Sequence, residues 1–81
     1  MRVTLKYFGL LAEITHCNEE QMELTADVNT LLGLKSAVEH RFPVFQKTAY
    51  SIALNQALCN DDLALKDDDE IAFLPPFAGG Q

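Results

Sequence analysis

The sequence predicts an α+β fold, in which one main helix packs on one face of a mixed β-sheet. Two patterns and the chain length support this prediction. Apolar residues alternate with polar ones near both ends of the chain, as in half-buried strands, and recur at spacings of three and four in one central stretch, as in an amphipathic helix. The 81 residues suffice for one domain and are too few for a second.

Residues 2–8 are predicted to form the first strand, because apolar side chains occupy alternate positions. These positions are Val3, Leu5 and Tyr7. Gly9 breaks the alternation, and the residues after it predict one helical turn over 10–14. A second strand is predicted at about residues 21–25, and its closeness to the first indicates an antiparallel hairpin with a decorated loop.

One amphipathic helix is predicted in the middle of the chain, from residue 31 to residue 42. Its apolar stripe consists of Leu31, Leu34, Val38 and Phe42, and its capping candidates are Asp27, Asn29 and Thr30. Pro43 cannot continue the helix, which therefore ends at Phe42. Gly33 in the first turn costs up to about 1 kcal/mol relative to alanine, and the sequence offers no reason for it.

The second half of the chain is predicted to supply three more strands. Alternation indicates a strand over residues 50–54, and Asn55-Gln56 is the predicted turn into a short strand over 57–59. Leu63 and Leu65 are predicted to fill core positions in an irregular segment, and the charged turn at 66–70 leads into the last strand, 71–74. This order permits a β-grasp arrangement, with the first and last strands parallel at the sheet centre and the helix across one face.

The chain is predicted to leave the fold at Pro75, so that residues 1–74 form a domain and residues 75–81 a flexible C-terminal tail. Two consecutive prolines cannot donate to a sheet and favour an extended backbone. Gly79 and Gly80 then allow the main chain to approach a partner closely. Seven extended residues span about 23 Å at roughly 3.3 Å each, enough to enter a partner's pocket.

The net charge of −6, from twelve acidic and six basic residues, argues against nucleic acid and anionic membranes as partners. An acidic domain associates faster with a basic protein surface. No apolar run approaches the roughly 18 residues of a membrane span, and the N-terminus alternates like a strand rather than a signal peptide. We therefore expect a cytoplasmic protein.

No conventional active site is evident in the sequence. His16 and Cys17 are neighbours, but adjacency alone does not make a catalytic pair. Cys17 and Cys59 have neither a CxxC spacing nor histidines at metal-ligand spacing, so we expect two free thiols. The acidic run at 67–70 lacks the spacing of a calcium loop and is predicted to be a solvated turn. No bound metal or cofactor is expected.

Alternation also predicts which apolar side chains point away from the helix. If Tyr7 faces the helix, Phe8 faces away, and the same reasoning turns Ala72 and Leu74 of the last strand outward. A contiguous group around the root of the tail would form a docking patch, unless the chain's own loops cover part of it. The members of this group would be Phe8, Leu58, Leu74 and Phe77.

The C-terminal third carries a resemblance to a known family. Residues 69–80 read Asp-Glu-Ile-Ala-Phe-Leu-Pro-Pro-Phe-Ala-Gly-Gly and, with Leu-Asn-Gln at 54–56 and Tyr7-Phe8, resemble the small subunits of molybdopterin synthase. That family consists of sulfur carriers with the ubiquitin-like β-grasp fold. Thiamine-pathway carriers also end in Gly-Gly, but they usually lack the Phe-x-Pro-Pro run that this chain has at 73–76.

The resemblance implies a function for the tail. In that family, an adenylating, E1-like enzyme uses ATP to turn the terminal glycine carboxylate into an acyl-adenylate, which becomes a thiocarboxylate. The carrier docks on a large subunit and gives its sulfur to a pterin precursor in molybdenum cofactor biosynthesis. The chain would be the non-catalytic, sulfur-donating subunit of this sulfurtransferase and would itself bind no cofactor.

The resemblance also assigns roles by position. The sulfur would be carried by Gly80, and Gly79 would allow the close fit in the partner. The tail would be positioned by Pro75, Pro76, Phe77 and Ala78. The interface with the large subunit would include Phe8, Leu58 and Leu74.

Two residues depart from the family pattern. Asp68 stands where glycine is usual before the Asp-Glu pair, a small change because aspartate tolerates turn geometry. Gln81 follows the Gly-Gly pair and holds the Gly80 carbonyl in a peptide bond. We favour removal of Gln81 by a protease. Alternatively, the enzyme system accepts a glutamine terminus, or the chain is not an active carrier.

Two other function classes are compatible with the sequence. The first is a sulfur carrier for thiamine or for thiolated tRNA. The second is a ubiquitin-like modifier or a non-catalytic binding module, whose tail forms an isopeptide bond or merely docks. Conjugates on cell proteins would favour the modifier, and a stable complex with a larger basic subunit would favour molybdopterin synthase.

Overall fold

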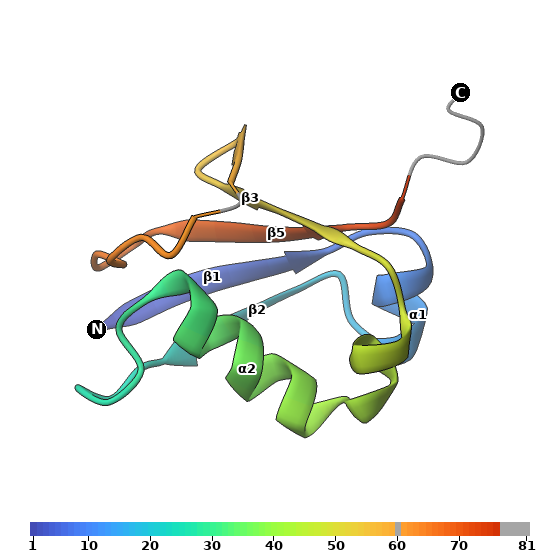
Figure 1. The fold of residues 1–81 in the computed structure, drawn as a ribbon, viewed down its shortest axis with the longest axis horizontal. Coiled ribbons are helices and arrows are strands. Elements are labelled where there is room, and N and C mark those ends of the chain that lie inside the picture. The colour runs from blue at the N-terminus through green and yellow to red at the C-terminus, as the bar shows by residue number, and fades with distance from the viewer. Residues whose placement is uncertain (60, 77–81) are drawn as a thin grey trace.

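A five-stranded mixed sheet forms one layer of the protein over the residues that the structure describes, 1–59 and 61–76 (Figure 1). The structure is a computed structural model. The strand order is β2-β1-β5-β3-β4, and β1 (Arg2–Tyr7) runs parallel to β5 (Glu70–Leu74) at the sheet centre. Helix α2 (Leu31–Arg41) crosses one face. The predicted α+β, β-grasp architecture is confirmed.

The other elements follow the predicted order with small shifts, except that a 3-10 helix, η1, was not predicted. They are α1 (Leu10–Thr15), β2 (Glu19–Glu23), the 3-10 helix η1 (Pro43–Lys47), β3 (Ser51–Leu54) and β4 (Ala57–Leu58). The prediction placed β2 two residues too late. His16 ends α1 in the left-handed conformation, so the chain reverses early and Glu19 already pairs with Lys6. The described sheet ends at Leu74, while the division into a domain and a tail stays a prediction.

Aromatic side chains form the centre of the core between the sheet and the helices. Phe45 is buried in η1 and its ring lies 6.2 Å from Tyr7 and 5.9 Å from Phe73, centroid to centroid. Such contacts add to the stability gained from apolar burial. The prediction missed Phe45, because the two adjacent apolar residues of this short 3-10 helix, Val44 and Phe45, form no periodic pattern. Leu65 is buried as predicted. Leu63, in contrast, is 44% exposed and does not fill a core position. Its backbone carbonyl accepts a hydrogen bond from the Leu31 N–H at 2.8 Å, at the start of α2.

The start of α2 explains the glycine that the sequence left unexplained. Thr30 is the N-cap, and its Oγ1 accepts from the Gly33 N–H at 3.2 Å. A Cβ on Gly33 would lie 3.2 Å from that same oxygen, which is tight. The Asp62 carboxylate accepts from the Leu32 N–H at 2.9 Å. Two side chains, those of Thr30 and Asp62, and the Leu63 carbonyl thus satisfy three of the donors that a helix start leaves free.

The hairpin turn and the acidic run are joined by one buried carboxylate. Asn55 and Gln56 have φ of 50° and 74°, as a two-residue hairpin requires, which confirms the predicted turn. Asn55 donates to Asp69 Oδ1 at 2.9 Å, and the Lys66 N–H donates to Asp69 Oδ2 at 2.7 Å. Asp69 is 8% exposed, so the prediction of a fully solvated turn is wrong at this position.

The substitution Asp69→Ala is expected to lower the free energy of unfolding by about 2 kcal/mol, because it removes a buried, charged acceptor from the hydrogen bonds donated by the Asn55 amide and the Lys66 N–H. Urea unfolding followed by circular dichroism measures the change. The matched control is Asp61→Ala, which removes an exposed carboxylate and should change stability by less than about 0.5 kcal/mol. Equal stabilities for the two variants would contradict the structural role of Asp69.

Candidate functional site

The sheet face opposite α2 carries exposed apolar side chains, which we name the open face and define by Phe8, Leu58 and Leu74. Phe8 is 44% exposed and Leu58 is 67% exposed, while Leu74 is half-buried. The Phe8 N–H donates to the Phe73 carbonyl at 3.2 Å, so the β1–β5 pairing continues beyond the strand and places Phe8 beside Leu74. The predicted outward orientation is confirmed, and the alternative that loops cover these residues does not hold for Phe8 or Leu58.

Two alanines connect the apolar side chains across the sheet. Leu58 pairs with Ala53, and Ala53 pairs with Ala72, so these three residues form one row of the open face. Ala72 is little exposed although it points away from the helix, because its small side chain is flanked on both sides by neighbouring strands. The open face is therefore low at its centre, with taller side chains at its margins.

Lys6 occupies the same row and was missed by the sequence reasoning. It pairs with Ala72, and its Nζ lies 3.5 Å from a Glu70 oxygen and 4.0 Å from a Glu19 oxygen. Such pairs at a partly exposed surface contribute little stability. Their effect is to border the apolar row with charges of both signs. Alternation could have found Lys6, since it lies two positions before Phe8 on the same face.

The root of the tail adjoins this face. Leu74 pairs with Ser51 at the end of β5, Pro75 is half-buried, and Pro76 is exposed. Figure 1 shows that β5 ends beside the loop that connects β1 to α1. The predicted site residues Phe77, Ala78, Gly79 and Gly80, together with Gln81, lie outside the described residues. The structure therefore brings together Phe8, Leu74 and Pro75 at one end of the sheet, whereas Leu58 lies on the same face but two strands away from β5.

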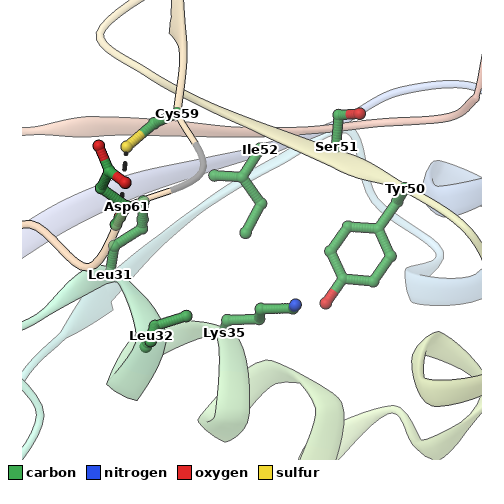
Figure 2. A pocket seen from close by; sticks show the side chains of 8 residues that line it. All are labelled: Leu31, Leu32, Lys35, Tyr50, Ser51, Ile52, Cys59 and Asp61. Atoms are coloured by element: carbon green, nitrogen blue, oxygen red, sulfur yellow. Dashed lines mark hydrogen bonds between the residues drawn. The ribbon is translucent and has the colours of Figure 1, made fainter.

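A cavity of about 130 Å³ lies between the start of α2 and β3, on the helix side of the sheet (Figure 2). Its lining includes Lys35, Tyr50 and Cys59. Burial, together with the hydrogen bond to Glu39, raises the pKa of Tyr50 above its usual range, so this hydroxyl stays neutral. The Cys59 thiol donates to the Asp61 carbonyl at 3.4 Å. The lining thus offers no nucleophile paired with a base.

The remaining candidates for conventional chemistry are explained by structure. The Cys17 thiol contacts Thr15 Oγ1 at 3.7 Å, and both cysteines are free and half-buried, as predicted. Within residues 1–59 and 61–76, no group of three His, Cys, Asp or Glu side chains is placed to hold a metal ion. The pKa of Tyr7 is raised, mainly by burial and to a smaller extent by the hydrogen bond that its hydroxyl donates to Glu20.

In the described ranges, no helix has the length and apolar character to cross a membrane.

Fold and site together define a ubiquitin-like β-grasp domain with an apolar sheet face next to the root of its C-terminal tail. The model of the ThiS family matches residues 5–80. The chain is 36% identical, over 84 aligned residues, to a molybdopterin synthase sulfur carrier subunit from Chlamydomonas reinhardtii, and the alignment covers 99% of this chain and 100% of the relative. The chain belongs to the ThiS family of sulfur carriers.

Solved structures agree with this assignment. One is a complex of subunits 1 and 2 of molybdopterin-converting factor from Helicobacter pylori, with a TM-score of 0.72 and 28% identity over 99% of this chain and 100% of that chain. Another is small archaeal modifier protein 1 from Methanosarcina acetivorans, with a TM-score of 0.78 and 21% identity over 98% and 96% of the two chains. The second likeness concerns the fold alone.

Proposed function

We propose that this chain is the sulfur carrier and small subunit of a molybdopterin synthase. The observation that carries the proposal is the full-length similarity to the Chlamydomonas reinhardtii sulfur carrier subunit. The open face next to the tail root supports it, because a carrier must dock while its C-terminus enters the partner's site. The partner is a large subunit, as in the Helicobacter pylori complex of subunits 1 and 2.

The chemistry follows from the poor reactivity of a carboxylate, which is ionised at neutral pH. An adenylating enzyme joins the Gly80 carboxylate to the α-phosphate of ATP and releases pyrophosphate. A sulfur donor then displaces AMP, so that one oxygen of the carboxylate is replaced by sulfur. In the large subunit, this thiocarboxylate sulfur attacks a carbon of the pterin precursor and displaces an oxygen substituent from it, which gives a thioester between Gly80 and the pterin. Hydrolysis of this thioester by water returns the Gly80 carboxylate and leaves the sulfur on the pterin as a thiolate. Glycine suits each attack, since no side chain shields its carbonyl.

The proposal requires that Gln81 be removed before the Gly80 carboxylate is activated. The intact Gly79-Gly80 pair directly before it motivates removal by a peptidase, which would free the Gly80 carboxylate. Activation is therefore expected to begin only after this cleavage.

Affinity purification of the tagged chain from its own cells tests the proposal. We expect one stable complex with a larger subunit and no ladder of conjugates on other proteins. The purified complex should transfer one sulfur atom to the pterin precursor for each thiocarboxylated carrier that is consumed. A ladder of isopeptide conjugates without such a complex would instead identify a modifier.

A second candidate is a sulfur carrier for thiamine or tRNA thiolation, and it is favoured by one observation, the match to the ThiS family as a whole. The same purification separates the two. Capture of an enzyme that builds the thiazole ring or thiolates tRNA, instead of a large subunit that acts on the pterin, would support the second candidate.

A further inference from the structure

The loop between β1 and α1 holds the ring of the first tail proline. Gly9 has φ 57° and ψ −131°, a conformation that residues with a side chain rarely adopt. A Cβ built on Gly9 would lie 3.1 Å from Pro75 Cγ, 3.7 Å from its Cβ and 3.9 Å from its Cδ. Three ring atoms of Pro75 therefore occupy the space next to the bare Cα of Gly9.

We name the contact surface that Gly9 offers to the Pro75 ring the seat. Hydrogen bonds hold the loop that forms this seat in place. The Phe8 N–H donates to the Phe73 carbonyl at 3.2 Å, which ties the loop to β5 immediately before the tail. The carbonyls of Phe8 and Gly9 accept from the Leu11 and Ala12 N–H groups, both at 3.1 Å, and so begin α1. Leu11 is fully buried and anchors α1 in the core. The seat is therefore connected to the core from two sides.

We infer that Gly9 is a positioning residue for the C-terminal tail, because its missing side chain lets the Pro75 ring pack against a fixed loop and so sets the direction in which the chain leaves β5. This inference rests on the proposed function, since it concerns the aim of a tail that carries sulfur. Proline fixes its own φ, so a held ring also orients the bond that follows it. Orientation before docking lowers the entropy lost when the tail enters its partner's site.

The seat can be observed in the free, full-length chain without any sulfur chemistry. We expect a nuclear Overhauser effect between the Gly9 Hα and the Pro75 ring protons in the wild type. Gly33→Ala is the matched control, since the added methyl group there also meets a neighbour at 3.2 Å, but at the α2 N-cap. The effect should persist in this control and disappear in Gly9→Ala. Its absence from the wild type would overturn the inference.

A second experiment measures the rate of sulfur transfer in a single turnover, at a saturating concentration of the large subunit. Each variant is prepared as the Gly80 thiocarboxylate. We expect Gly9→Ala and Pro75→Ala each to lower the rate by about tenfold, and Gly33→Ala to leave it unchanged. The double variant Gly9→Ala/Pro75→Ala should be no slower than the slower single variant, because both changes remove one contact. Losses that multiply in the double variant, or a wild-type rate for Pro75→Ala, would contradict the inference.

The Overhauser measurement and the sulfur-transfer measurement together distinguish a failure of this inference from a failure of the proposed function. Should Gly9→Ala fail to fold, Pro75→Ala still removes the contact without backbone strain, and thermal unfolding of each variant shows which comparison is valid. A wild-type protein that shows the Overhauser effect but transfers no sulfur would overturn the proposed function and leave the seat established. A wild-type protein that transfers sulfur but lacks the Overhauser effect would overturn the inference about Gly9 and leave the proposed function standing.

Discussion

A chain that ends at Ala78 is expected to lose sulfur transfer by at least about a hundredfold, because its terminal carboxylate is too short to reach the reacting atoms. Each missing residue shortens the reach by up to roughly 3.3 Å. The fold should be unaffected, since the described sheet ends at Leu74. The measurement is product formation from the pterin precursor with the large subunit, the activating enzyme, ATP and a sulfur donor.

The matched control is a chain that ends at Gly80, which should be active without any peptidase. The full-length chain should remain inactive under the same conditions, because Gln81 holds the Gly80 carbonyl in a peptide bond. Activity of the chain that ends at Ala78, at a rate comparable with that of the Gly80 chain, would show that the Gly-Gly pair does not carry the sulfur.

The second large effect is expected for Phe8→Asp, which places a carboxylate in the open face. A charge buried without a partner in an interface costs about 3 kcal/mol or more, so the Kd for the large subunit should rise by about a hundredfold. Phe8 is 44% exposed in the free chain, so the fold should tolerate the change. Isothermal titration calorimetry of the two subunits measures the Kd.

Leu32→Asp is the matched control for this prediction. Leu32 is also an exposed apolar residue, at 51%, but it lies on α2 and therefore on the helix side of the sheet. Its replacement should leave the Kd within about twofold of the wild type, because rim and distant surface changes have small effects on binding. If Leu32→Asp weakened binding and Phe8→Asp did not, the large subunit would have to dock on the helix side.

The architecture could be predicted from sequence wherever the pattern was periodic. Alternation gave β1 and the predicted last strand, and the spacing of three and four gave α2 between its N-cap Thr30 and Pro43. The failures occurred where a single contact decides the structure. Phe45 is held in the core by a 3-10 turn. Asp69 is buried where its carboxylate accepts from Asn55, a contact between residues that are distant in sequence.

The candidate site was predicted in part for the same reason. Strand alternation placed Phe8 and Leu58 on the open face, and the structure bears out their exposure. Strand alternation could not reveal the contact of Pro75 with Gly9, because the two residues are distant in sequence and meet only when β1 and β5 pair in parallel. The role of Gly80 is a prediction from sequence and family, since that residue lies outside the described part of the chain.

The intact mass of this protein, isolated from its own cells, tests the central claim most directly. We expect a species that has lost Gln81 and in which one oxygen is replaced by sulfur, with the change located at Gly80 by fragmentation. This species should revert to the carboxylate after incubation with the large subunit and the pterin precursor. A population that retains Gln81 and carries no sulfur, in cells that are making the molybdenum cofactor, would contradict the claim that this chain is the working sulfur carrier.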